Sequence, residues 1–567
     1  MSKNTKIESD KVLIQKIFTD FWFRVPNFQR SYVWGTDEIN ELIDDIWFAA
    51  DNNSESEYFI GSMVLQKKER TTERPYDEYD VLDGQQRLTS VLMLIAVIRD
   101  ISNEADLKND CNDYIFQQEN KYKKIPERLR INYEIRDKVE DFINEFVKEE
   151  GGTGNKEVLK EKSKVNNRSI SNMASAILEM RSKLERMSSD DVSDLSIFLF
   201  NNVLMIYVSS ENLDDAFRLF TILNARGIPL TNSDILKAWN LGEVKSDKKR
   251  EKYARFWEET EGSIGGDEFD RLLAHIRSIY VKDKARDSLL NEFTKKIYGA
   301  KPPLLTKGSK TLDVVKKYYG HYNLLIRLDD ETNQLDNEFK NLITVMQYGL
   351  PSTDWVPSLL FYYEKFKNKE ILTFLKKLDN KFSADWLLKF TPTDRIKQMN
   401  AIISKIESTD EPLDVINDSA IFDIDISNLE SAFSEDIYHK RYSKYVVFKL
   451  EYLQKDKTQR FMEFKYLSLE HILPQNPKED SNWKKYFNDI ELKKWVHKLG
   501  NLVLMSRIKN ASLGNKEFEE KKNRYFQGNI DAFPNSLKVM QNNQWTPVEI
   551  EARQKETLSL LLTHYKL

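Results

Sequence analysis

The length, composition and charge of the chain narrow the classes of protein to which it can belong. A chain of 567 residues is long enough for about three or four domains, and 40% hydrophobic residues can build sizeable cores. Only 18 Gly and 14 Pro exclude collagen-like and broadly disordered classes, and a net charge of −5 gives no overall electrostatic reason to bind nucleic acid.

The first hundred residues combine strand and helix patterns. Residues 58–66 and 79–82 are rich in β-branched and aromatic side chains, which predicts two strands separated by a polar loop. Residues 88–98 are apolar almost all round, which predicts a buried helix that follows a strand and a turn. The N-terminal region is therefore predicted to be α/β or α+β.

The next part of the chain is predicted to be mainly helical. Residues 151–155 (GGTGN) have the composition of a flexible break. The amphipathic pattern of residues 170–185 predicts a helix, whereas residues 195–208 fit either a strand or a buried helix. Residues 216–241 predict two helical stretches hinged at an NARG sequence, and helical spacing of apolar residues then dominates residues 253–450.

The C-terminal region shows the order strand, loop, strand, helix. Residues 467–475 (LSLEHILPQ) form a short β-type run stopped by a proline, and residues 497–504 (HKLGNLVL) form a turn that leads into a strand. Residues 515–525 have helical character. Residues 451–530 hold sixteen Lys and Arg against eleven Asp and Glu, which fits a phosphate-binding module or a solvated lysine-rich surface.

The polar residues of this region fit the hydrolysis of a phosphodiester. That chemistry needs a divalent cation at the phosphate, a neutral imidazole to activate water, and a group that holds the imidazole in the right tautomer. Glu470 and Asn510 offer the hard oxygen ligands that suit Mg²⁺ or Mn²⁺. His471 would be the general base, and Asn501 would orient its ring or fix its loop. Taken alone, His471 fits a buried structural histidine better than a catalytic one.

Three further basic residues in this region remain unassigned. His497, Lys516 and Lys521 lie where a phosphate could be contacted, but nothing in their spacing singles them out. A histidine in a turn more often packs against the turn or caps it, so we expect that role for His497.

A second group of polar residues lies near the N-terminus, in residues 25–34 (VPNFQRSYVW) and 80–90 (DVLDGQQRLTS). The second segment predicts a tight turn at Asp83 and Gly84, directly before the start of a helix. Backbone N–H groups and the helix dipole favour an anion there, and Arg87 adds a bidentate donor. A nucleoside triphosphate or a DNA phosphate is the expected ligand, although the sequence has no Walker P-loop motif.

The two groups of motifs resemble one family. EHILPQ, GNLVL and KN look like the His-Me finger (HNH) nucleases, in the form of the C-terminal domain of GmrSD-type restriction enzymes. FQRxYxW, DGQQR and FTILNARG look like the N-terminal domain of the same family, which is similar in fold to ParB. The resemblance implies His471 as base, Glu470 and Asn510 as metal ligands, and Asn501 as the middle residue of the motif.

The resemblance also implies a site that binds a nucleotide, and hydrolyses it, or that reads modified DNA. Its residues would be Gln29, Arg30, Asp83, Gln85, Gln86, Arg87, Asn224 and Arg226. A structural salt bridge is the alternative for Arg30 and Arg226. The sequence departs from the nuclease family in two ways, because Asn510 stands in place of a histidine and the gap between His471 and Asn501 is long.

The fold class predicted from these observations is α+β and predominantly helical. We expect a ParB-like core in residues 1–110, its helical completion in 111–245, a helical middle region in 246–440, and a ββα-metal (HNH) nuclease domain in 441–567. The resemblance implies a modification-dependent (type IV) DNA endonuclease of anti-phage defence, gated by a nucleoside triphosphate of unknown base. Its partners would be modified phage DNA and the nucleotide, and a homo-oligomer is left open.

Two other functions are left open by the sequence. One is a nucleotide-controlled switch that binds DNA or a partner and has little nuclease activity, and the other is an RNA-cleaving toxin. The single cysteine, Cys111, excludes an intramolecular disulfide and a thiolate zinc cluster. Because the N-terminus lacks the apolar core of a signal peptide and no window is apolar enough to span a membrane, we expect a cytoplasmic protein.

Overall fold

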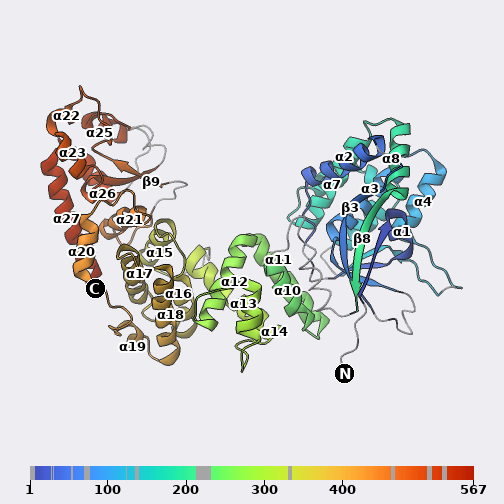
Figure 1. Ribbon diagram of the computed structural model, residues 1–567, viewed down its shortest axis with the longest axis horizontal. Helices are drawn as coiled ribbons and strands as arrows, with labels where there is room; N and C mark the ends of the chain where they lie inside the picture. Colours follow the sequence, from blue (N-terminus) through green and yellow to red (C-terminus); the bar gives the residue numbers. More distant parts are fainter. Residues whose placement is uncertain are drawn as a thin grey trace. The chain divides into compact units, whose positions relative to one another are not determined.

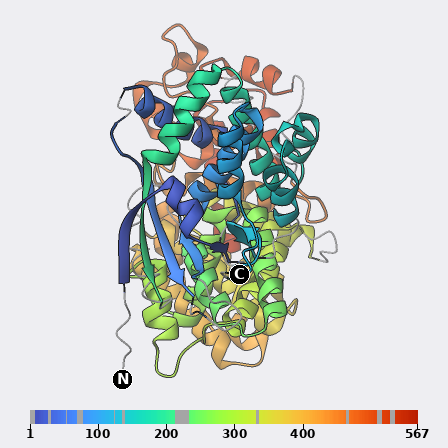
Figure 2. The ribbon, with the colours of Figure 1, turned by 90° about the vertical axis from the view of Figure 1, so that its right-hand side faces the viewer.

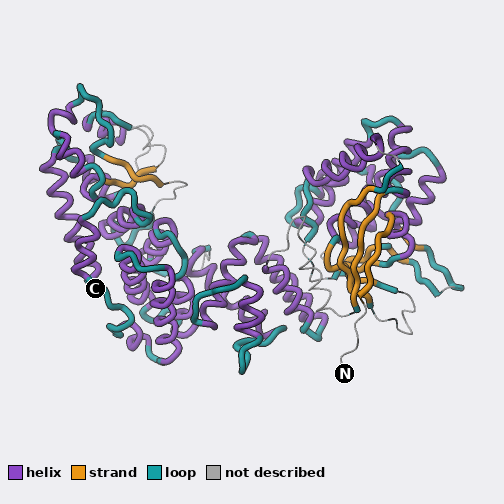
Figure 3. Tube along the Cα trace, in the orientation of Figure 1, coloured by secondary structure: helices purple, strands orange, loops and turns teal. Residues whose placement is uncertain are grey.

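The computed structural model describes most of the chain, which is largely helical (Figures 1 and 3). The described residues are 7–26, 29, 31–52, 55–68, 70, 77–122, 124–134, 139–211, 232–329, 335–461, 467–506, 514–526 and 533–566. The chain divides into two compact units, Met1–Gly266 and Asp267–Leu567. Many helices with a small mixed sheet agree with the predicted α+β class. None of the helices in the described part of the chain is long and apolar enough to cross a membrane.

The first unit is built around a mixed sheet of six strands in the order β1-β8-β3-β4-β2-β7 (Figure 2). The strands are β1 (Ile7–Leu13), β2 (Phe23–Val25), β3 (Tyr58–Lys67), β4 (Tyr79–Asp83), β7 (Ile131–Tyr133) and β8 (Val203–Ser210). β8 pairs antiparallel with β1 and parallel with β3, and β4 pairs antiparallel with β3 and parallel with β2. The two predicted strands are thus neighbours, as β3 and β4.

Helix α3 (Gln85–Ile101) is the central helix of this unit. Every residue from Leu88 to Ile98 is buried, as the apolar run predicts. The helix contacts α4 and α7, and α7 coincides with the helix predicted over residues 170–185. The remaining elements of the unit are α1 (Ile14–Asp20), α2 (Thr36–Asn52), α4 (Ala105–Ile115), β5 (Phe116–Gln117), β6 (Arg128–Leu129), α5 (Val139–Ile143), η1 (Asn144–Lys148), η2 (Gly152–Gly154), α6 (Lys156–Lys162), α7 (Arg168–Leu184), α8 (Ser189–Asn201), α10 (Asn232–Gly242) and α11 (Asp247–Ile264).

The prediction of a flexible break at GGTGN is wrong. These residues form a packed turn, in which Gly152 and Thr153 are buried. Asp100 accepts hydrogen bonds from Gly151 N, Thr153 N and Thr153 Oγ1 at 2.9, 3.0 and 2.6 Å. A Cβ on Gly152 would lie 2.6 Å from the carbonyl oxygen of Glu145. Gly152 is therefore needed for close backbone approach, and Gly151 for a left-handed backbone with φ of 81°.

The structure describes one further predicted segment of the first unit in full and another in part. Residues 195–208 contain both predicted alternatives, because α8 ends at Asn201 and β8 begins at Val203. Of the two helices predicted over residues 216–241, the second is α10. The first helix and the NARG hinge lie outside the described residues.

Most of the predicted helical region lies in the second unit, after α11 at the end of the first. Its elements are α12 (Gly266–Val281), α13 (Leu289–Glu292), η3 (Phe293–Tyr298), α14 (Ser309–Tyr322), η4 (Asn323–Arg327), α15 (Asn337–Gly349), α16 (Val356–Phe366), α17 (Ile371–Leu387), α18 (Pro392–Ser408), α19 (Pro412–Ile416), α20 (Ile426–Ser434) and α21 (Ser443–Gln454). Helix α15 packs against α21, and α16 packs against α18.

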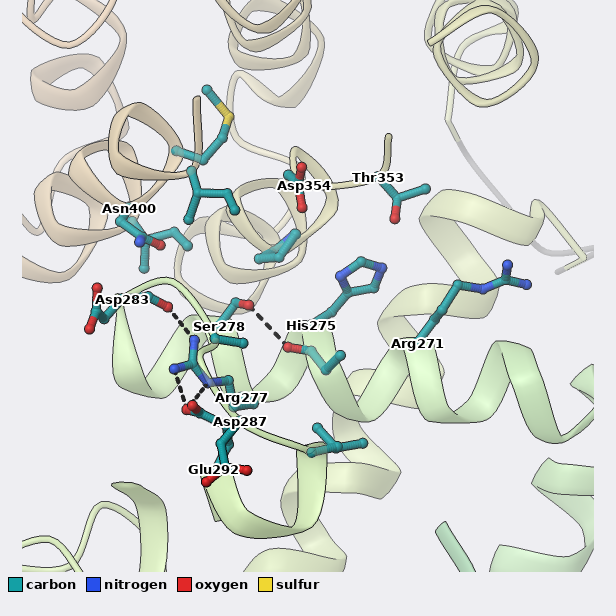
Figure 4. A pocket seen from close by; sticks show the side chains of 17 residues that line it. Arg271, His275, Arg277, Ser278, Asp283, Asp287, Glu292, Thr353, Asp354 and Asn400 are labelled. Carbon is teal, nitrogen blue, oxygen red and sulfur yellow. Dashed lines mark hydrogen bonds and ion pairs between the residues drawn. The ribbon is translucent and has the colours of Figure 1, made fainter. Parts of the chain in front are cut away.

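A cavity of about 380 Å³ lies between α12, α16 and α18 (Figure 4). His275 on α12 lines it with only 8% of the residue exposed. Burial lowers the pKa of His275 to about 4, so the ring is neutral at pH 7. Beside it, Arg277 forms a buried ion pair with Glu292.

The C-terminal part of the second unit has the predicted order of strand, loop, strand and helix. Its elements are β9 (Leu467–His471), α22 (Asn482–Tyr486), α23 (Asp489–Trp495), η5 (Leu499–Asn501), β10 (Leu502–Ser506), α25 (Phe518–Phe526), α26 (Pro534–Met540) and α27 (Pro547–Tyr565). The insertion between the strands folds as α22 and α23. Its buried Trp483 shares a core with Val503 of β10 and Phe518 of α25.

Candidate functional site

The antiparallel pair β9 and β10 fixes the backbone of the candidate site. His471 lies opposite Leu502 in the register, and Glu470 lies opposite Val503. Consecutive residues of a strand point to opposite faces, so Glu470 and His471 present their side chains in different directions. Both are buried, with 7% and 6% exposed.

A lysine of α25 joins the two residues. The Lys521 side chain is fully buried, and its Nζ donates to Glu470 Oε1 and to the carbonyl oxygen of His471, each at 2.7 Å. Burial raises the pKa of Glu470 and lowers that of Lys521, and in each case the partner's charge acts in the opposite direction. The pair therefore ties the helix to the end of β9. Sequence analysis did not single out Lys521 for this role.

The ring of His471 is held neutral by its surroundings. Burial lowers its pKa to about 3, and nearby His497, Lys521 and His439 add to the effect. A neutral imidazole keeps one nitrogen lone pair that can accept a proton. The ring thus has the protonation state that a general base needs at neutral pH.

Other rings surround His471, so that three of the six histidines of the chain gather here. His471 Nε2 lies 3.3 Å from His497 Nδ1, and His471 Nδ1 lies 3.3 Å from Gln475 Nε2. The ring of Tyr438 approaches that of His471 to 4.1 Å between centroids. His439 contacts the ring of His497, with 4.6 Å between centroids.

Asn501 contacts the loop that follows β9. Its Nδ2 donates to the carbonyl oxygens of Leu473 and Val496 at 3.0 and 2.9 Å. Its Oδ1 accepts from Leu473 N at 2.7 Å and from Trp545 Nε1 at 3.2 Å. Of the two roles considered for Asn501, its position fits the one of fixing the loop.

The C-terminal helix α27 holds the turn that carries Asn501. Arg553 donates to the carbonyl oxygens of Gly500 and Leu502 at 2.6 and 2.8 Å. Gln554 Oε1 accepts from Gly500 N at 2.6 Å. A Cβ on Gly500 would lie only 2.6 Å from the carbonyl oxygen of Ile550, so the helix can approach this turn only because position 500 is glycine.

Of the two predicted metal ligands, the structure describes Glu470 alone. Lys521 bonds one of the two carboxylate oxygens of Glu470, and Asn510 lies outside the described residues. Among the described residues, no group of three or more His, Cys, Asp and Glu side chains could hold a metal ion. Mg²⁺ is commonly bound by only one or two protein carboxylates, together with substrate phosphate and water, and a cation at Glu470 stays a prediction.

The structure brings several predicted N-terminal residues to the start of α3. Gln29 Nε2 donates to the carbonyl oxygen of Leu82 at 3.1 Å. The Gln86 amide accepts from Val33 N at 2.8 Å and donates to Ser31 O at 3.2 Å. Gln29 is therefore held at the end of β4, and residues 31–33 at the start of α3.

The turn before α3 has the predicted form. Asp83 ends β4, Gly84 adopts a left-handed conformation with φ of 90°, and α3 begins at Gln85 without a side-chain cap. Gln85 is buried, and Arg87 lies against Gly61, where an added Cβ would come within 2.8 Å of the guanidinium. Arg30, Asn224 and Arg226 lie outside the described residues, so the nucleotide site stays a prediction.

Two protein-family models match the chain. The model for the N-terminal domain of the GmrSD restriction endonuclease matches residues 11–241, and the model for the C-terminal domain matches residues 423–559. The first match contains the β4–α3 turn, and the second contains β9, β10 and α25. The curated proteins contain no match to this chain.

Proposed function

Because the chain belongs to the GmrSD restriction endonuclease family, we propose that it hydrolyses DNA phosphodiesters with His471 as general base and a divalent cation at Glu470. One observation carries the proposal. A buried neutral imidazole and a buried carboxylate belong to consecutive residues at the end of β9, and Lys521 bonds to the carboxylate of Glu470 and to the backbone carbonyl oxygen of His471. Such a fixed arrangement is what preorganised catalysis requires.

The proposed reaction is an attack of water on phosphorus. His471 takes one proton from the water, whose oxygen forms the new bond to phosphorus. The bond from phosphorus to the 3′-oxygen breaks, its electron pair stays on that oxygen, and a proton from solvent completes the 3′-hydroxyl. A cation held by Glu470 and Asn510 would supply positive charge against the phosphate and the leaving oxygen.

The chain's own residues would position these groups. Lys521 keeps the Glu470 carboxylate and the His471 carbonyl in fixed places, and Asn501 fixes the loop from Leu473 onward. The net positive charge of residues 451–530 supports contact with a phosphate backbone.

The test is a cleavage assay with the His471→Ala variant in Mg²⁺. Loss of a general base is expected to lower the rate by about 10²- to 10⁴-fold. Undiminished Mg²⁺-dependent cleavage by this variant would refute the assignment.

Unmodified plasmid, phage DNA with modified cytosines and RNA are compared as substrates. Preference for the modified DNA is expected, whereas cleavage of RNA alone would favour a toxin.

We further propose that the start of α3 binds the triphosphate of a nucleotide that controls cleavage. Helix α3 begins after the left-handed Gly84 without a side-chain cap, and Arg87 follows within the first turn. Arg87→Ala is expected to weaken nucleotide binding at least tenfold in calorimetry. Arg70→Ala is the matched control, because Arg70 is exposed and pairs only with Asp77 among the described residues. Equal affinity of the two variants for the nucleotide would refute the proposed site.

A further inference from the structure

We propose that His497 is a positioning residue, which sets the tautomer of His471 so that Nδ1 becomes the basic nitrogen. The inference rests on the proposed function of His471. It concerns a contact that no motif assigns, since sequence analysis expects His497 only to pack or cap a turn. The contact joins the end of β9 to the turn before β10.

The two hydrogen bonds of the His471 ring agree with a single direction of donation. Gln475 offers an amide N–H to His471 Nδ1, which must then be the acceptor nitrogen. A neutral ring that accepts at Nδ1 carries its proton on Nε2. That proton points to His497 Nδ1, 3.3 Å away, which accepts it. Gln475 therefore donates to His471, and His471 donates to His497.

If the two hydrogen bonds had the opposite direction, the basic nitrogen of His471 would be one that water cannot reach. With the Gln475 amide turned, its oxygen would accept from Nδ1–H, and the lone pair of His471 would lie on Nε2 against His497. That nitrogen faces another ring inside the site, whereas Gln475 is exposed. Because water and an amide N–H donate to a lone pair in the same way, the Gln475 amide occupies the place at Nδ1 that the attacking water would take.

Neighbouring residues hold the His497 ring in this position. The backbone carbonyl oxygen of His497 accepts from Ile437 N at 3.1 Å, which ties the turn to the segment before α21. The ring stacks on Tyr438 at 14° between planes, with 5.6 Å between centroids. The ring of His439 makes an edge contact with the His497 ring, with 4.6 Å between centroids. Such packing limits the ring to few orientations, as a positioning residue requires.

Two substitutions at position 497 separate positioning from packing. His497→Asn keeps an oxygen acceptor near the place of Nδ1, whereas His497→Phe keeps a ring and removes the acceptor. The phenylalanine variant is expected to lose about 10- to 100-fold in kcat with little change in KM, and the asparagine variant to retain most of the activity. The same pair of substitutions at His321, which bonds to Glu364 in the helical region, serves as the control and is expected to leave cleavage unchanged.

A second measurement does not depend on activity. Nitrogen NMR of protein labelled only in histidine reports the tautomer of each ring, and the signals lost in His471→Ala identify His471. We expect the Nε2–H tautomer in the wild type and in His497→Asn, and a shift toward Nδ1–H in His497→Phe. An Nδ1–H ring in the wild type, or no change in His497→Phe, would overturn the inference. If His471→Ala still cleaves DNA, the proposed function fails, and the NMR result still decides the tautomer.

Discussion

Among the residues of the candidate site, Lys521 is the one whose removal should lower the free energy of unfolding most. It is the counter-ion of a carboxylate that is nine-tenths buried, and removing one partner of a buried pair leaves an uncompensated charge. Lys521→Met is expected to destabilise the second unit by about 3–5 kcal/mol in chemical denaturation. Adding Glu470→Gln should recover much of that stability but not the cleavage activity.

The control for this prediction is a surface ion pair at the start of α25. Lys516 and Glu520 form an exposed i,i+4 ion pair, and such pairs contribute at most about 0.5 kcal/mol. Lys516→Met should therefore be almost neutral. Equal losses of stability in Lys516→Met and Lys521→Met would show that the buried pair has no special importance.

The burial of His275 at the cavity of Figure 4 predicts that the stability of the protein depends on pH. The folded state lowers the pKa of this ring from 6.5 to about 4, so it favours the neutral form. Its contribution is present above pH 6.5 and is lost as the pH falls toward 4, because the unfolded chain then binds the proton more readily. The free energy of unfolding should thus fall by up to about 3 kcal/mol more in the wild type than in His275→Leu over that range. Parallel pH curves for the two proteins would contradict the assignment.

At the scale of elements, the order of β9, β10 and α25 could be predicted because each has a local pattern. Alternation and a proline limit β9, and the glycine-containing turn precedes β10. The roles of Lys521 and His497 could not be predicted, because each depends on a contact between segments that are far apart in the sequence. The packed GGTGN turn could not be predicted for the same reason, since Gly152 packs against η1 and Gly151 N donates to Asp100.

The packing of α27 against the turn before β10 makes Gly500 indispensable. Gly500→Ala would push a methyl group against the backbone of Ile550, and overpacking of this kind costs about 1–3 kcal/mol. Because the same turn carries Asn501, cleavage should fall along with stability. Thermal unfolding and a cleavage assay on the same sample measure both.

A second glycine of the same unit provides the comparison. Gly320 lies inside α14, where an added Cβ would meet nothing within 4 Å. Gly320→Ala is expected to be neutral or to stabilise by about 0.5–1 kcal/mol, because alanine is the better helix former. A stable and fully active Gly500→Ala protein would mean that α27 does not determine the position of Asn501.

At the scale of the whole molecule, the two matched domains fall in different compact units, with α3 in the first and His471 in the second. The sequence could indicate both ends through their motifs, since each motif is local. It could not indicate a coupling between them, which depends on how binding at one site changes the free energy of the other. The coupling is therefore a matter for measurement in the full-length chain.

If a nucleotide controls cleavage through DNA binding, the effect must be reciprocal. His471→Ala allows both ligands to be studied without cutting, because its DNA stays intact. A nucleoside triphosphate that changes the affinity of this variant for DNA by a given factor must have its own affinity changed by DNA by the same factor. We expect a factor of about 5–150, and adding Arg87→Ala should bring it to one. A factor of one in the His471→Ala protein itself would show that the nucleotide does not act through DNA binding, and would confine any control to the cleavage step.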